Sequence, residues 1–249
     1  EQLELQYDRA GEASADGLVL PDDALADIPD YLTRNFGPSF RTEQAMEEIE
    51  SAVCTGIHEE RKLLFTDGLS EDAYKGSEPR AQSLRASRDG NLKMLQEHED
   101  AARQGIRSIG QAFRNALSLR SEPDVYRADH GALQNDLLWK VGRCENPQLF
   151  EKIVRQEPSD VVVELLIDAS GSQSVRQSMV ALQSYLFSAA LSRIRIPHRV
   201  MSYCTYGSYT VLRRFRDYDD RPEADRRILE YRAMSNNRDG LALAAAGLD

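Results

Sequence analysis

One apolar run constrains the fold of this 249-residue chain more than any other feature. Residues 161–167 read VVVELLI and end at Asp168. A β-branched run that is apolar on both faces is typical of a strand buried on both sides, as in a parallel sheet. An amphipathic helix is expected to follow from Ser174 to Ser192. This strand-to-helix unit predicts an α/β fold for the part of the chain around it.

The residues after this helix extend the same pattern. Val200–Cys204 and Tyr209–Phe215 are predicted strands, and the turn residues 206–208 between them are typical of a hairpin. Helices are expected over Ala224–Met234 and from Leu241 onward. The alternation indicates a sheet covered by helices.

The first part of the chain has a different pattern. Apolar residues recur at helical spacing from Thr42 to about Leu64 and from Arg80 to Leu119, and a short helix is expected at Leu133–Val141. Residues 1–27 are acidic and poor in large apolar side chains, which predicts a loop or a disordered arm. We therefore expect a mainly helical region over residues 1–157 and an α/β domain over residues 158–249.

Charge and cysteine content narrow the classes of function. The net charge is −10, and residues 1–160 hold 31 acidic and 19 basic side chains, which argues against a broad nucleic-acid-binding face there. The arginines near residue 214 are followed at once by Asp217, Asp219 and Asp220, so no nucleic-acid partner is predicted. Three cysteines without a CxxC pair favour reduced thiols in the cytoplasm. The sequence has no stretch of 18 consecutive apolar residues, so no membrane span is predicted.

A loop with three oxygen-bearing side chains follows the buried strand directly. Asp168, Ser170 and Ser172 offer one carboxylate and two hydroxyls at the carboxyl end of a strand, where open α/β sheets place their ligand sites. These hard oxygen ligands suit Mg²⁺ or Mn²⁺. Because only one formal negative charge is supplied, the ion would attract a carboxylate from a partner. The alternative is a polar turn in which a serine only caps the helix.

Other chemistries have weaker support in the sequence. Asp168 could act as a phosphoryl-accepting nucleophile, but Ser170 stands where such hydrolases carry a second aspartate. The chain has no nucleophile elbow, Walker A loop or dinucleotide-binding glycine motif. Cys54 and His58 are spaced to share one helix face, and we interpret them as packed neighbours because no second ligand pair has zinc-like spacing.

The strand ending in Asp168-x-Ser170-x-Ser172 resembles the metal-ion-dependent adhesion site of a von Willebrand factor A domain. The later segment, residues 237–243 (NRDGLAL), is similar to the second metal loop in a bacterial branch of that family. The branch includes nitric oxide reductase activation proteins and cobalt chelatase subunits. Residues 207–212 and 215–218 also resemble it. The likeness covers about residues 160–249 and is weaker over 100–157.

The chain departs from the family pattern in two places. Most A domains carry threonine in the second loop, whereas this chain has Asn237 and Asp239. Asn237 aligns with the threonine, but Asp239 is the stronger ligand for a hard cation, so both stay candidates. An A domain also continues with a further strand and metal loop after the point where this chain stops. We therefore expect a von Willebrand A-type, Rossmann-like domain that is incomplete at its C-terminus, with an unpaired sheet edge.

The resemblance implies a function without catalysis. It implies a metal-dependent protein-binding module that works with a MoxR-type AAA+ ATPase in assembling or activating a metalloenzyme. A partner aspartate or glutamate would complete the metal shell. The alternatives are an accessory subunit of a cobalt or magnesium chelatase, and a phosphoryl-transfer hydrolase that uses Asp168.

Overall fold

The computed structural model describes residues 28–76, 78–120, 124–143, 148–154 and 161–248. These form two compact units. The first joins the residues before Arg107 to the residues from Val162 onward, and the second is Arg107–Val161. Each unit is described by itself.

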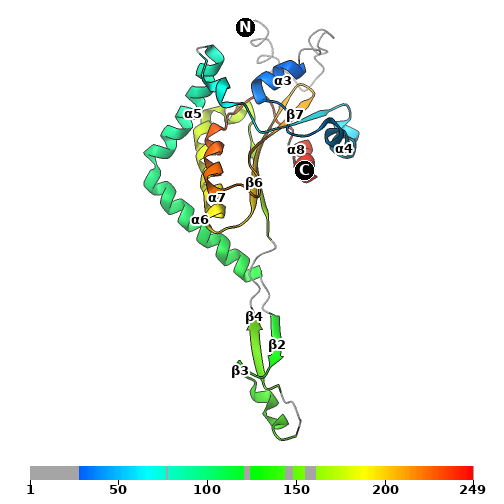
Figure 1. Ribbon diagram of the computed structural model, residues 1–249, viewed down its shortest axis with the longest axis vertical. Helices are drawn as coiled ribbons and strands as arrows, with labels where there is room; N and C mark the ends of the chain where they lie inside the picture. The colour runs from blue at the N-terminus through cyan, green and yellow to red at the C-terminus, as the bar shows by residue number, and fades with distance from the viewer. Residues whose placement is uncertain (1–27, 77, 121–123, 144–147, 155–160, 249) are drawn as a thin grey trace. The chain divides into compact units, whose positions relative to one another are not determined.

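A four-stranded sheet is the centre of the first unit (Figure 1). Its order is β1-β7-β6-β5, with bounds β1 Lys62–Thr66, β5 Val163–Asp168, β6 His198–Tyr206 and β7 Tyr209–Arg216. β5 pairs parallel with β6, β7 pairs antiparallel with β6, and β1 pairs parallel with β7. Among the described strands, β1 and β5 lie at the two edges of this sheet.

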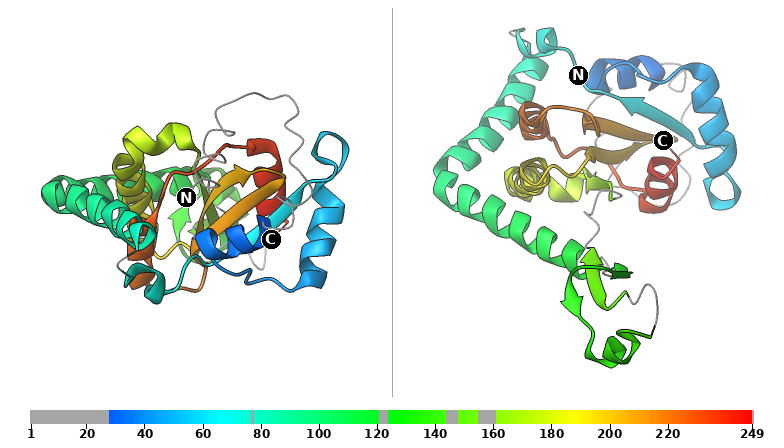
Figure 2. Two further views of the ribbon diagram at one scale, coloured as in Figure 1. Left: turned by 90° about the horizontal axis from the view of Figure 1, so that it is seen from above. Right: turned by 60° about the horizontal axis from the view of Figure 1, so that its bottom comes forward.

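Helices cover both faces of this sheet, as the two views of Figure 2 show. One face carries α3 (Ile28–Phe36), α5 (Pro79–Glu97), α7 (Gln177–Arg193) and the 3₁₀ segment η5 (Pro222–Glu230). The other face carries α4 (Glu43–Val53) and α8 (Asp239–Ala246). The remaining short 3₁₀ segments are η1 (Gly56–His58), η2 (Glu71–Tyr74) and η4 (Gly171–Arg176).

Alternation along β6 separates two apolar cores. Val200 and Cys204 point to the α7 face, whereas Met201 and Tyr203 point to the α8 face. All nine residues of β6 are buried, which fits a strand covered on both sides. None of the helices in the described ranges combines the length and the apolar character that a membrane crossing needs.

A polar network is buried between α7 and the sheet. The Ser188 Oγ donates to Asp225 Oδ1 at 2.7 Å and lies 2.8 Å from His198 Nε2. Ser192 Oγ donates to Asp225 Oδ2 at 2.7 Å, and Arg216 Nη1 donates to Asp225 Oδ1 at 2.8 Å. Asp225 is therefore the shared acceptor of this cluster, in which Ser188, His198, Arg216 and Asp225 are almost fully removed from water and Ser192 is half-buried.

The second unit holds a small three-stranded sheet. Its order is β2-β4-β3, with bounds β2 Asp124–Ala128, β3 Ala132–Leu133 and β4 Phe150–Val154. The long helix α6 (Glu99–Arg120) runs into this unit, and η3 (Asn135–Lys140) follows β3. Several large apolar side chains are exposed here, among them Trp139.

The strand, the helix and the hairpin predicted after residue 160 are present in the structure, although their bounds differ by a few residues. The helices from residue 79 to 120 are present as well. The helix predicted from Thr42 to Leu64 is wrong at its end. α4 stops at Val53, and Leu63 instead joins β1, where Leu63 and Phe65 are buried beside β7. Local periodicity did not reveal this, because pairing with a strand far along the chain decides it. The helix predicted at 224–234 is instead the 3₁₀ segment η5.

The compact units also divide the chain differently from the expected 1–157 and 158–249. β1 belongs to the α/β sheet, and α3 and α4 contribute to the apolar cores on its two faces. α5 packs against α7 and η5 of the same unit. The second compact unit is Arg107–Val161. Residues 1–27 and the predicted boundary at 157–160 lie outside the described residues.

Candidate metal centre

The end of β5 places Asp168 at the rim of the sheet. Asp168 pairs in register with Tyr203 of β6 and follows Leu166 by two residues, so its side chain lies on the α8 face. Its backbone carbonyl accepts a hydrogen bond from the Tyr231 hydroxyl at 2.6 Å. The pairing with β6 and the hydrogen bond from Tyr231 therefore both hold the end of β5 in place.

Three of the predicted ligands come together in this loop. Ser170 Oγ lies 3.0 Å from Asp168 Oδ2 and 2.8 Å from Ser172 Oγ. The Ser170 backbone N–H donates to Asp168 Oδ1 at 2.8 Å, and Gln173 Nε2 donates to Oδ2 at 3.2 Å. The loop therefore gathers one carboxylate and two hydroxyls within hydrogen-bonding distance of one another.

The spacing of these oxygens fits a small octahedral cation. Metal–oxygen bonds of about 2.0–2.1 Å at right angles place neighbouring ligand oxygens roughly 3 Å apart. The distances from Ser170 Oγ to Asp168 Oδ2 and to Ser172 Oγ are 3.0 and 2.8 Å. Ser170 is buried and Ser172 is exposed, so the cluster is open to solvent on the Ser172 side.

The second loop is tied to the first through its backbone. Gly171 N–H donates to the Ser235 carbonyl at 2.6 Å, and Met234 N–H donates to the Ala169 carbonyl at 2.7 Å. A Cβ on Gly171 would lie 3.1 Å from the Ser235 oxygen, so a larger residue there would push the two loops apart. Asn236 forms a bridge with Thr205 at the end of β6.

The two candidate ligands of the second loop are placed differently. Asp239 begins α8, and its Oδ1 accepts a hydrogen bond of 2.8 Å from the Tyr203 hydroxyl. Burial, the bond to Asp239 and the charge of Asp168 all raise the pKa of Tyr203. Tyr203 therefore lies beside both carboxylates. Asn237 lies in the loop before α8, and both Asn237 and Asp239 are exposed.

Sequence reasoning missed Gln173, Tyr203 and Tyr231. Gln173 is one residue beyond the motif, and its contact with Asp168 arises from the η4 turn. Tyr203 and Tyr231 come from distant elements, so no local spacing signals them.

The types of side chain at the site determine which cations it suits. Within the described residues, no three His, Cys, Asp or Glu side chains gather as a metal-binding group. Any ion here would depend on serine hydroxyls, which favours Mg²⁺ or Mn²⁺ over Zn²⁺. Cys54 and His58 do not share a helix face, because α4 ends at Val53 and His58 lies in η1.

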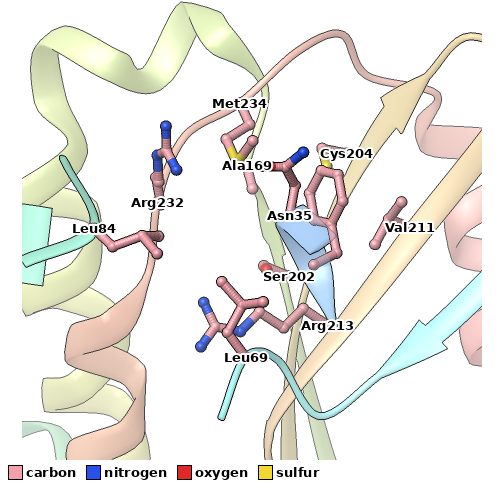
Figure 3. A pocket seen from close by; sticks show the side chains of 11 residues that line it. Asn35, Leu69, Leu84, Ala169, Ser202, Cys204, Val211, Arg213, Arg232 and Met234 are labelled. Atoms are coloured by element: carbon pink, nitrogen blue, oxygen red, sulfur yellow. The ribbon is translucent and has the colours of Figure 1, made fainter. Parts of the chain in front are cut away.

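A pocket lies on the opposite face of the sheet (Figure 3). Its walls include Ser202 and Cys204, which alternate with Tyr203 along β6 and so point away from the α8 face. Arg213 also lines it, held by an ion pair of 2.7 Å with Glu230. Ala169, the residue between Asp168 and Ser170, also lines the pocket, so the pocket borders the loop of the oxygen cluster from the other face of the sheet.

The chain matches no family model, no curated protein and no solved structure at a significant level. The geometry of the described residues therefore carries the functional interpretation.

The second loop provides a direct test of its ligand. Asp239→Asn is expected to weaken Mn²⁺ binding more than Asn237→Ala, because a carboxylate holds a hard cation more tightly than an amide. Isothermal titration calorimetry on the two variants measures the order. The reverse order would assign the direct contact to Asn237 and leave Asp239 orienting a water or Tyr203.

Proposed function

We propose that the chain is a von Willebrand A-type protein that binds a protein partner through a divalent metal ion and performs no catalysis itself. The observation that carries the proposal is the Asp168–Ser170–Ser172 oxygen cluster, with ligand-like spacing at the carboxyl end of a buried strand. The mixed α/β sheet covered by helices is compatible with this Rossmann-like class.

In this proposal Asp168, Ser170 and Ser172 hold Mg²⁺ or Mn²⁺, and Asp239 or Asn237 completes the shell directly or through water. When bound, the ion supplies an electrophilic position for a partner's aspartate or glutamate. The backbone bonds between the two loops keep the serine and aspartate side chains in place. The single carboxylate of the cluster leaves the ion a formal charge of about +1 when Asn237 or water completes the shell, and a direct contact with Asp239 would bring the site closer to neutral.

The rim of the site suits a protein surface. Val175, three residues after Ser172, is 94 % exposed, and Met179 on the next turn is 51 % exposed. Exposed apolar side chains beside a polar centre are typical of an interaction site. A partner that presents an acidic residue flanked by apolar ones would contact both features.

The family resemblance supports a MoxR-type AAA+ ATPase as the partner, acting in the cytoplasm in the assembly or activation of a metalloenzyme. A cobalt or magnesium chelatase subunit is the alternative within the same class. A phosphoryl-transfer role for Asp168 has less support, because Ser170 and Gln173 occupy its carboxylate oxygens and Ser170 replaces the second acid.

The experiment is a pull-down of a purified MoxR-type AAA+ ATPase by this chain, with Mg²⁺ and with EDTA. Binding is expected only with Mg²⁺ and is expected to be lost in the Ser170→Ala/Ser172→Ala variant. Losing a contact of this kind costs about 2–5 kcal/mol, enough to remove a micromolar complex from detection. Ser174→Ala, an exposed serine of the same turn outside the cluster, is the control and should still bind. Equal binding with Mg²⁺ and with EDTA would contradict the proposal.

A further inference from the structure

A pocket of about 30 Å³ lies on the α7 face of the sheet, within the first compact unit (Figure 3). Strands β6 and β7 form its floor, where Ser202 pairs in register with Arg213 and Cys204 pairs with Val211. Residues directly opposite each other on paired strands present their side chains to the same face. The Ser202 hydroxyl and the Arg213 side chain are therefore neighbours in the floor of this pocket.

The walls of the pocket come from elements that are far apart in the chain. Phe36 ends α3, Leu84 lies in α5, and Arg232 and Met234 follow η5. Figure 3 shows Leu84, Arg232 and Met234 around the same space as Ser202. A mostly apolar lining with a few polar groups is typical of a ligand site. The volume exceeds the roughly 10–15 Å³ that one water needs, so the pocket accommodates a small molecule or the tip of one side chain.

The hydroxyl of Ser202 is a buried polar group that faces this pocket. Ser202 is 5 % exposed, and no residue that the structure describes forms a hydrogen bond with its Oγ. The other buried serines of the unit, Ser170 and Ser188, both have hydrogen-bond partners. Leaving a buried hydroxyl without a partner costs free energy. A polar group held in the pocket would supply the partner for Ser202.

The charged side chains that line the pocket favour an anion as that group. Arg213 and Arg232 line it, and none of the described residues in its lining is an aspartate or glutamate. Glu230 lies outside the lining, where its Oε2 and its backbone carbonyl accept hydrogen bonds from Arg213 at 2.7 and 3.0 Å. These two bonds fix the Arg213 side chain and offset its charge. The charge of Arg232 is added to this balanced pair.

We propose that this pocket binds a small carboxylate group. Its oxygens accept hydrogen bonds from the Ser202 hydroxyl and from the guanidinium of Arg232, because forked guanidinium donors match a carboxylate. The short apolar part of the ligand contacts the apolar side chains of the wall. The Asp168 side chain lies on the α8 face, so the site does not use the oxygens of the metal centre and does not depend on the proposed function.

The test titrates acetate, and separately acetamide, into the full chain after a chelating resin has removed divalent ions, at constant ionic strength. The two molecules have nearly the same shape, but only acetate is charged. Acetate is expected to bind saturably with a Kd on the order of 1 mM, because so small a ligand gains little binding free energy. Amide chemical shifts in NMR should change at Ala169, Ser202 and Met234, which line the pocket. Absence of saturable acetate binding, or equally tight binding of acetamide, would overturn the proposal.

Two variants locate the bound acetate. Ser202→Ala and Arg232→Gln should each lower the affinity about tenfold or more, because each removes a donor to a charged group. Ser202→Ala removes a hydroxyl without a partner in the described structure, so this variant should fold even if Arg232→Gln does not. Arg226→Gln is the matched control, because Arg226 is exposed on η5 outside the pocket, and it should bind like the wild type. Equal loss in Arg226→Gln, or unchanged binding in Ser202→Ala, would contradict the assignment.

A further titration separates the two sources of a carboxylate. Glutamate blocked at its amino and α-carboxyl groups represents the acidic side chain of a peptide, whereas acetate represents a free small molecule. Tighter binding of blocked glutamate would assign the pocket to an acidic peptide, and tighter binding of acetate would assign it to a free carboxylate. Because no divalent ion is present in these titrations, failure of the metal site does not affect the result.

Discussion

Replacing Asp225 by alanine is expected to destabilise the first unit by about 3–5 kcal/mol, because breaking a buried ion pair leaves its partner charge uncompensated. Asp225 accepts hydrogen bonds from Ser188, Ser192 and Arg216, and it is 3 % exposed. Alanine removes every one of these acceptors. Urea unfolding followed by circular dichroism measures the loss.

The charges of this network explain why the effect is large. Arg216 Nη1 donates to Asp225 Oδ1, and both side chains are buried. The hydroxyls of Ser188 and Ser192 donate to the same carboxylate. Removing Asp225 therefore leaves the buried Arg216 cation without an anion and the two serine hydroxyls without their acceptor.

The same network sets a pH dependence. Burial alone would raise the pKa of Asp225, but hydrogen bonds from His198, Ser188 and Ser192 and the charge of Arg216 outweigh it and lower the pKa below 3.8. A carboxyl whose folded pKa is lowered contributes stability above its unfolded pKa and loses it as the pH falls through the folded value. The wild type should therefore lose stability below about pH 4 more steeply than Asp225→Ala.

Asp72→Ala is the control for both measurements. Asp72 forms an exposed ion pair with Lys75, and such pairs contribute about 0–1 kcal/mol. Its loss should leave the unfolding free energy nearly unchanged. A similarly small effect for Asp225→Ala would show that the buried network is not needed for stability.

The second large effect is expected at Asp168. Asp168→Ala should lower Mn²⁺ affinity by more than about 100-fold, because it removes the only carboxylate among the three clustered oxygens. Calorimetry on the full chain measures the affinity, and circular dichroism checks the fold. The loss should exceed that in Gln173→Ala, which removes a donor that orients the carboxylate and is expected to cost about 10–100-fold.

Unchanged Mn²⁺ binding in Asp168→Ala would place the metal elsewhere. A loss confined to Gln173→Ala would indicate that the loop conformation, and not the carboxylate, controls binding. Either result would remove the basis of the proposed function.

The site was predictable where its residues lie within a few positions of each other. Asp168, Ser170 and Ser172 follow a strand that the apolar pattern already identified, and one tight turn brings their oxygens together. The second loop was also recognised from its polar residues. Asp239 and Asn237 are both exposed, and the hydrogen bond from Tyr203 to Asp239 joins β6 to the start of α8.

The sequence by itself determined the strands, the hairpin and the main helices of residues 161–248, because periodicity of apolar residues reports which face of each element is buried. Only the tertiary structure decided that Lys62–Thr66 is a strand, since its pairing with β7 joins residues far apart in the chain. The same holds for the contacts of Asp225 with Ser188 and with Arg216. Such contacts depend on how distant elements pack. Burial strengthens the interaction between charges there, because the surroundings screen them less than water does. Spacing along the chain, in contrast, carries information only about neighbours within a turn or two.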